Sequence, residues 1–160
     1  MEKLNIIYVD DQREVLSTIG KELEPFEDYF ILEECESADE TMELLDEVDL
    51  NGDFVAIIIC DHIMPGKNGI ELLTEINEDN RFEHTKKILL TGMATHKDTI
   101  MAINKAGIDH YLEKPWKSDE LIAMVKELVT LYILEKGIDY NPYLKILDQK
   151  ILYDKLHKSE

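Results

Sequence analysis

The sequence predicts an α/β fold: a doubly wound, five-stranded parallel sheet with helices on both faces. Short apolar runs alternate five times with segments whose apolar residues recur at helical spacing, and this alternation favours parallel strands joined by right-handed crossovers. The run VAIIIC at residues 55–60 is continuously apolar and rich in β-branched residues. Such a run is typical of a strand buried on both faces in the middle of a parallel sheet.

Five apolar runs without helical periodicity mark the expected strands. The run LNIIYV opens the chain, and VAIIIC gives the strongest signal of the five. In chain order, the strands are expected at residues 4–9, 30–35, 55–60, 87–90 and 110–113.

Helical spacing of apolar residues follows each strand. Ser37, with Glu40 three residues later, resembles a capping box that opens the second helix. Gly107 is expected to end the fourth helix, and Ser118 to cap the fifth. In chain order, the helices are expected around residues 15–23, 38–45, 69–77, 97–106 and 118–134.

Length and composition suit one domain with an appendage. At 160 residues and 44% hydrophobic residues, the chain can bury one sizeable core. We expect a domain at residues 1–130 and a helical C-terminal extension at residues 131–160. In the extension, Gly137 is expected to break the helix and Asn141, followed by proline, to begin another.

The expected extension has an apolar stripe that must pack on something. Leu144, Leu147 and Ile151 keep a three-then-four spacing along the predicted helix. The stripe either folds back on its own domain or pairs with a second copy or a larger partner.

Charge and cysteine content exclude some classes of function. The formal net charge is -18, and so negative a surface repels phosphate backbones, so we expect no direct nucleic-acid binding. No apolar stretch approaches the ~20 residues of a membrane span. The opening MEKLNIIYVDD reaches acidic residues too quickly for a secretory signal. Cys35 and Cys60 lie in apolar runs and are expected to be reduced core residues, which fits a cytoplasmic location.

The residues that directly follow the strands are the candidate functional residues. The first strand is followed by Asp10 and Asp11, the third by Asp61, the fourth by Thr91 and the fifth by Lys114. In a doubly wound sheet, ligands bind beyond the carboxyl ends of the strands. We therefore expect three carboxylates, a hydroxyl and an ammonium to meet at one edge of the sheet.

This set of groups suits metal-assisted phosphoryl chemistry. Three neighbouring carboxylates repel one another unless a cation lies among them, and hard oxygen ligands suit Mg²⁺ or Mn²⁺. The cation would offset the charge of an incoming phosphoryl group, which Asp61 could then attack in line. Lys114 and the Thr91 hydroxyl would hold the phosphoryl oxygens. The loop after Asp61 would direct the backbone carbonyl of Ile63 toward the metal.

Four motifs occur in order along the chain: Asp-Asp at 10–11, Asp-x-x-Met-Pro-x-x-x-Gly at 61–69, Thr-Gly at 91–92 and Tyr-x-x-Lys-Pro at 111–115. Together they resemble the receiver domain of two-component response regulators, over about residues 3–130. Each motif alone is weak, but all of them in order, each at a strand end, are specific. The resemblance implies a flavodoxin-like sheet with strand order 2-1-3-4-5.

The resemblance also implies roles for individual residues. Asp61 would be the phosphoacceptor, with Asp11 and Asp61 as direct metal ligands and Asp10 acting largely through water. Thr91 and Tyr111 match the switch pair, and Lys114 matches the lysine of the pattern. A histidine kinase or phosphotransfer protein would donate the phosphoryl group. A downstream partner would bind the face formed by the fourth helix, the fifth strand and the fifth helix.

Plainer interpretations exist for several of these residues. Asp11 could cap the first helix, with Glu14 three residues later, and Tyr111 could be a core aromatic. The five histidines are expected on the surface or in loops. His62 is expected to point away from the site, because side chains alternate at a strand end.

Three functions compete at this stage. The first is a switch that acts alone and catalyses only its own phosphorylation and dephosphorylation. The second is the receiver portion of a longer regulator whose output lies elsewhere. The third is a metal-dependent phosphohydrolase, which would want a second acid two residues after its nucleophile, where Ile63 stands. A homodimer is a further option for the first two.

Overall fold

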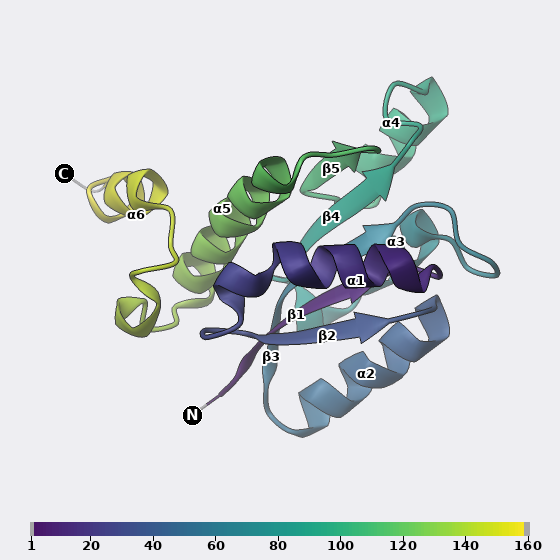
Figure 1. Ribbon diagram of the computed structural model, residues 1–160. Helices are drawn as coiled ribbons and strands as arrows, with labels where there is room; N and C mark the ends of the chain where they lie inside the picture. The colour runs from purple at the N-terminus through teal and green to yellow at the C-terminus, as the bar shows by residue number, and fades with distance from the viewer. Residues whose placement is uncertain (1, 159–160) are drawn as a thin grey trace.

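The strands form one parallel sheet in the order β2-β1-β3-β4-β5. The computed structural model describes residues 2–158. Figure 1 shows the arrows of the strands running toward one edge of the molecule. The bounds are β1 (Leu4–Val9), β2 (Ile31–Cys35), β3 (Phe54–Asp61), β4 (Lys86–Thr91) and β5 (His110–Glu113). The predicted fold class and strand order are confirmed.

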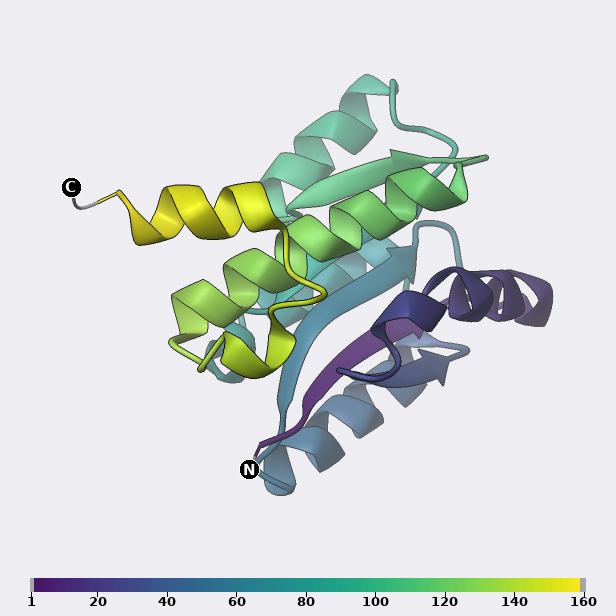
Figure 2. The same ribbon diagram turned by 60° about the vertical axis from the view of Figure 1, so that its left-hand side comes forward.

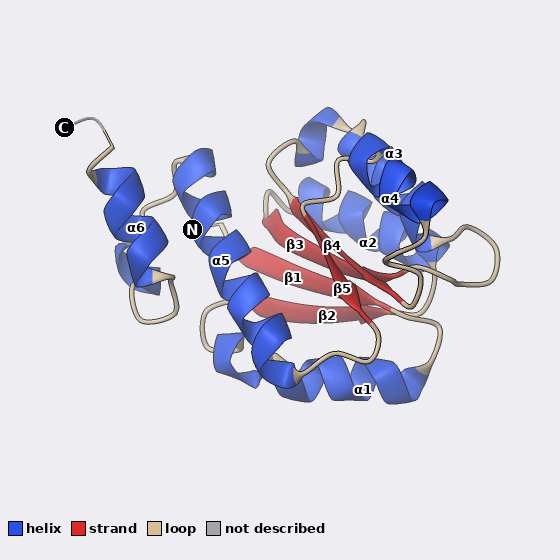
Figure 3. Cartoon of the chain, turned by 90° about the horizontal axis from the view of Figure 1, so that it is seen from above, coloured by secondary structure: helices blue, strands red, loops and turns tan. Residues whose placement is uncertain are grey.

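Helices cover both faces of the sheet. Figure 3 shows α1 and α5 on one face and α2, α3 and α4 on the other. The bounds are α1 (Arg13–Glu22), α2 (Ala38–Leu50), α3 (Gly69–Asn77), α4 (Lys97–Lys105), α5 (Ser118–Lys136) and α6 (Gln149–Leu156). Among residues 2–158 no helix combines the length and the apolar composition that crossing a membrane requires.

The central strand β3 shows why its sequence is continuously apolar. Ile57 and Ile59 belong to the core beneath α1 and α5, whereas Ile58 and Cys60 belong to the core beneath the opposite helices. Successive side chains of a strand point to opposite faces. Because both faces are covered, all four side chains are fully buried.

Two of the predicted helix starts differ in detail from the structure. The Ser37 side chain accepts a hydrogen bond from the Glu40 N–H at 3.1 Å, as a cap should. The Glu40 carboxylate, however, accepts from the Glu36 N–H, one residue before the position of a capping box. The prediction that Ser118 caps the fifth helix is wrong, because Lys117 is the N-cap residue and Ser118 is already helical.

The C-terminal segment begins its last helix later than predicted. Gly137 ends α5 with a φ of 78°, as expected of a residue without a side chain. Asn141 begins only the short 3-10 helix η3 (Asn141–Tyr143). The last helix α6 begins after Asp148, whose side chain accepts a hydrogen bond from the Ile151 N–H at 3.1 Å. That cap decides the start of the helix.

The segment that follows α5 folds back on the rest of the chain. The ring of Tyr143 stacks on Phe30 with centroids 5.6 Å apart. Leu147 and Leu152 are buried in the same core as the β1 residue Ile6. Figure 2 shows this segment and α6 lying against α5. Of the predicted stripe, Leu147 therefore packs on the chain's own domain, whereas Leu144 is exposed.

We expect Leu147→Ala to lower the free energy of unfolding by about 2–5 kcal/mol, because the fully buried leucine side chain would leave a cavity. Leu144→Ala is the matched control three residues away. Leu144 is 39% exposed, and its truncation should change stability by less than about 0.5 kcal/mol. Urea unfolding of both variants measures the difference, and equal stabilities would mean that the segment adds nothing to the core.

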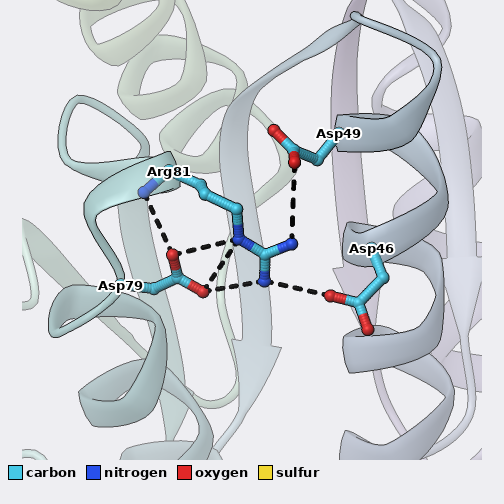
Figure 4. A network of polar contacts seen from close by, with 4 residues as sticks. All are labelled: Asp46, Asp49, Asp79 and Arg81. Atoms are coloured by element: carbon cyan, nitrogen blue, oxygen red, sulfur yellow. Dashed lines mark hydrogen bonds and ion pairs between the residues drawn. The ribbon is translucent and has the colours of Figure 1, made fainter.

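A cluster of ion pairs links the connection between β3 and β4 to α2 (Figure 4). Arg81 lies in the 3-10 helix η2 (Asn80–Phe82) and contacts Asp46 at 2.9 Å and Asp49 at 3.7 Å. It also binds Asp79, and these hydrogen bonds from Arg81 lower the pKa of the Asp79 carboxyl. Exposed pairs contribute only about 0–1 kcal/mol each. The cluster joins two segments that precede strands, so it lies away from the strands' carboxyl ends.

Candidate functional site

The pairing of the strands brings the predicted site residues to one edge of the sheet. Asp10 directly follows β1, whose last residue pairs with the residue before Asp61. Asp61 ends β3 and pairs with Leu90, the residue before Thr91. Thr91 ends β4 and pairs with Glu113, directly before the lysine at 114. The strand ends are therefore level with one another.

Three carboxylates lie close together at this edge. Asp10, Asp11 and Asp61 each offer an oxygen, and these oxygens lie within 4.8 Å of one another. Asp10 and Asp61 are buried, whereas Asp11 is exposed. The N-cap residue of α1 is Gln12, so Asp11 is not the cap that the plainer interpretation proposed. Its carboxylate belongs to the acidic cluster.

Asp10 has an oxygen that fits a cation. Its Oδ1 accepts a hydrogen bond from the Gln12 N–H at 2.8 Å. Its buried Oδ2 has no hydrogen-bond partner among the described residues, and the nearest ammonium, that of Lys114, is 4.0 Å away. Burial raises the pKa of Asp10. The charges of Asp61 and Asp11 raise it further, whereas the Gln12 N–H and Lys114 lower it.

The donor set suits a hard divalent cation. Three carboxylates supply only oxygen atoms, and one of those oxygens is buried without a partner. Mg²⁺ and Mn²⁺ prefer such ligands and keep several waters. The residues present therefore fit the metal that the sequence predicts.

Lys114 is directed into the acidic cluster. Its ammonium contacts the Asp61 carboxylate, and its backbone N–H donates to the Thr91 carbonyl at 2.9 Å. The backbone bond holds the lysine at the end of the sheet, so its side chain reaches Asp61 from β5. An ammonium here offsets part of the repulsion among the acids.

The loop from β3 to α3 turns back against its own start. The Gly69 N–H donates to the His62 carbonyl at 2.8 Å. A Cβ at Gly69 would lie 2.1 Å from the carbonyl oxygen of Asp61. Asn68 and Glu71 form a capping box that begins α3 there. Gly69 therefore allows the helix to begin beside the backbone of Asp61.

Thr91 and His62 form a contact that the sequence did not predict. His62 is 7% exposed, and its ring Nδ1 lies 2.8 Å from the Thr91 Oγ1. The same Oγ1 accepts a hydrogen bond from the Met93 N–H at 3.0 Å. The predictions that His62 lies on the surface and points away from the site are therefore wrong.

The side chain of His62 points toward Thr91 because of the pairing between their strands. His62 donates its backbone N–H to the Leu90 carbonyl at 2.9 Å, so it extends the pairing of β3 with β4 by one residue. That places it beside Thr91, and neighbours in paired strands point to the same face. Alternation does turn His62 away from Asp61, but toward the threonine. Burial lowers the pKa of His62, and Lys114 lowers it further, against the opposing effect of Asp61.

Two predicted residues have exposed side chains. Tyr111 lies on β5 and is 46% exposed, so it is not a plain core aromatic. Ile63 lies in the loop after β3, and its side chain is 62% exposed. The roles of Tyr111 as a switch residue and of the Ile63 carbonyl as a metal ligand stay predictions.

Known proteins are similar to this chain in sequence and in fold. The model of the response regulator receiver domain matches residues 6–126. The hydrogenase transcriptional regulatory protein HoxA of Cupriavidus necator is 33% identical over 80% of this chain, and the transcriptional regulatory protein CpxR of Klebsiella pneumoniae is 32% identical over 78%. The chain spans only 24% of that HoxA and 48% of that CpxR.

A solved structure agrees with these relatives. The signal receiver domain of an HD domain-containing protein from Pseudomonas fluorescens superposes with a TM-score of 0.71 at 27% identity. The match covers 86% of this chain and 94% of that domain. Both the sequence match and the fold confirm the resemblance that the strand-end motifs indicated. The chain belongs to the family of response regulator receiver domains.

Proposed function

We propose that this chain is a phosphorylation-controlled switch in which Asp61 accepts a phosphoryl group. A histidine kinase or phosphotransfer protein would donate it in an Mg²⁺-dependent reaction, and altered protein contacts would pass on the signal. The observation that carries the proposal is the meeting of Asp61 with the Lys114 ammonium and two further carboxylates at the edge of the sheet. Membership of the receiver family supports it.

The proposed chemistry is an in-line displacement at phosphorus. A carboxylate oxygen of Asp61 attacks, and a P–O bond forms as the P–N bond to the donor's imidazole breaks. The bonding pair stays on the imidazole nitrogen, which takes up a proton. Asp61 then carries an acyl phosphate. Lys114 already contacts the Asp61 carboxylate, so its ammonium is close enough to hold a phosphoryl oxygen.

The acidic cluster would hold the cation. Asp11 and Asp61 would bind it directly, Asp10 largely through water, and the carbonyl of Ile63 would complete the protein ligands. When bound, the cation supplies positive charge beside the oxygens of the transferring group. The unpartnered Oδ2 of Asp10 supports a cation in this cluster.

The proposed output is a change in the surface formed by α4, β5 and α5, which are neighbours in Figure 1. Thr91 would turn toward the phosphoryl group and Tyr111 would turn inward, which biases a two-state equilibrium. The exposed Tyr111 and Met101 belong to this surface. A downstream protein, or a second copy of the chain, would bind there. The buried, unbridged Cys35 and Cys60 support a reducing, cytoplasmic setting.

A second candidate is the receiver portion of a longer regulator. The relatives HoxA and CpxR extend well beyond the region matched by this chain. In that case Asp61 would work in the same way, but the phosphorylated surface would control an output segment. Neither candidate makes the chain an enzyme that acts on external substrates.

The test is intact mass after incubation with acetyl phosphate and Mg²⁺. We expect one labile phosphoryl group on the wild type, and none on Asp61→Asn or when a chelator removes the metal. Asp28→Asn is the matched control, because Asp28 is an exposed acid outside the cluster, and it should be labelled like the wild type. Labelling of Asp61→Asn, or an unlabelled wild type, would overturn the proposal.

A further inference from the structure

The Thr91 hydroxyl already has two partners within the chain. Its oxygen accepts from the Met93 N–H at 3.0 Å and lies 2.8 Å from the Nδ1 of His62. Thr91 is 1% exposed, so bulk water does not compete for this hydroxyl. A hydroxyl has one proton and two lone pairs. Whichever partner donates in the contact with His62, the contact breaks if the hydroxyl turns elsewhere.

The backbone fixes both partners of this contact. His62 donates its N–H to Leu90 at 2.9 Å and accepts from the Gly69 N–H at 2.8 Å. Thr91 accepts from the Lys114 N–H at 2.9 Å through its carbonyl. These hydrogen bonds fix both backbones, so no loop has to become ordered for the ring to meet the hydroxyl. The strand pairing and the loop that hold these two backbones therefore also hold the contact in place.

We propose that His62 is a positioning residue that holds the Thr91 hydroxyl in its resting direction, so that a phosphoryl group on Asp61 must compete with the His62 ring for Thr91. This inference rests on the proposed function. The His62 contact stabilises only the resting state, whereas a hydroxyl-to-phosphoryl bond stabilises only the phosphorylated state. The exposed side chain of Tyr111 fits the same resting state.

Removal of the ring contact should favour the phosphorylated arrangement. The net strength of an ordinary hydrogen bond corresponds to about a two- to tenfold change in an equilibrium constant. A protein without the contact should therefore bind a phosphoryl mimic about two- to tenfold more tightly. Loss of packing alone would lower stability without this gain in affinity.

The experiment compares two side chains of the same branching at position 62. His62→Asn keeps a polar atom where Nδ1 lies, whereas His62→Leu puts a methyl group there. Beryllofluoride with Mg²⁺ serves as the phosphoryl mimic, and fluorine NMR measures its binding. We expect His62→Leu to bind it about two- to tenfold more tightly than His62→Asn, which should resemble the wild type. Urea unfolding of each variant reports its stability separately.

A double-mutant cycle separates positioning from packing. Thr91→Val removes the hydroxyl but keeps the shape of the side chain. In that background no hydroxyl is left to be held, so replacing His62 by Leu should leave the affinity for beryllofluoride unchanged. Equal affinities of His62→Leu and His62→Asn with Thr91 present, or the same gain in the Thr91→Val background, would overturn the inference.

The failure of the proposed function is distinguishable from these outcomes. If the wild type binds no beryllofluoride in Mg²⁺ and takes no phosphoryl group from acetyl phosphate, the proposed function fails, and the inference fails with it. If the wild type binds the mimic and His62 has no effect, only the inference fails. Nitrogen NMR of the ligand-free protein adds a direct check, because Thr91→Val should shift the resonance of the His62 Nδ1.

Discussion

Gly69→Ala is expected to lower the free energy of unfolding by about 2–4 kcal/mol and to disable the site. The added Cβ would lie 2.1 Å from the carbonyl oxygen of Asp61, 2.9 Å from its carbonyl carbon and 3.1 Å from the Cα of His62. All three are backbone atoms, so no flexible side chain can move aside. Either α3 or the backbone of Asp61 must shift.

A shift of Asp61 would also remove it from Lys114 and from the acidic cluster. A displacement of about 1 Å costs about a hundredfold in rate when reacting groups must align. We therefore expect phosphorylation of Gly69→Ala by acetyl phosphate to be slower by about that factor. Urea unfolding and intact mass against time measure the two effects.

Gly92→Ala is the matched control at the same edge of the sheet. Apart from its two chain neighbours, a Cβ there meets no atom of the described residues within 4 Å. Its stability should stay within about 0.5 kcal/mol of the wild type, which makes it the control for the unfolding measurement. If Gly69→Ala behaves like Gly92→Ala, the backbone of Asp61 does not depend on the close approach of α3.

Asp10→Asn is expected to stabilise the metal-free protein by about 1–2 kcal/mol at neutral pH and to weaken its stabilisation by Mg²⁺. The Oδ2 of Asp10 is buried beside two other carboxylates without a hydrogen-bond partner. Leaving a buried polar group unsatisfied costs about 1–3 kcal/mol. An amide carries no charge, so the substitution removes the repulsion but also removes a group that the cation needs.

The gain in stability of Asp10→Asn over the wild type should depend on pH in a defined direction. The pKa of Asp10 is raised in the folded protein, chiefly by burial. Ionised Asp10 therefore costs folding free energy, and the cost is fully present above the folded pKa. It decreases as the pH falls through the folded pKa toward the unfolded value near about 3.9. The difference between Asp10→Asn and the wild type should vanish below that pH.

Asp11→Asn provides the comparison that separates charge from burial. Asp11 is exposed, so its substitution should change metal-free stability by less than about 0.5 kcal/mol. It should still weaken stabilisation by Mg²⁺, which for the wild type is about 2.7 kcal/mol at a hundred times the dissociation constant. Urea unfolding in chelator and in Mg²⁺ measures the stability of the wild type, Asp10→Asn and Asp11→Asn. A less stable Asp10→Asn in chelator, or no effect of Mg²⁺ on the wild type, would contradict this account of the cluster.

The local sequence pattern was sufficient to predict an element's bounds where that segment alone decides its structure. The expected bounds of β1, α3 and β5 agree with the structure, because apolar periodicity and bounding polar residues act within a few positions. The start of α6 was missed because Asn141 followed by proline is a local helix signal. The competing signal is the side chain of Asp148, which caps the helix instead.

The sequence by itself determined the parallel α/β fold and the edge of the sheet at which Asp10, Asp61, Thr91 and Lys114 meet. These follow from strand periodicity and from the position of each residue just after or at the end of a strand. Only the tertiary structure decided that His62 lies against Thr91, that an oxygen of Asp10 has no partner among residues 2–158, and how the C-terminal segment packs. Such contacts depend on the register between strands and on the packing of distant segments, and the pattern within one segment contains neither.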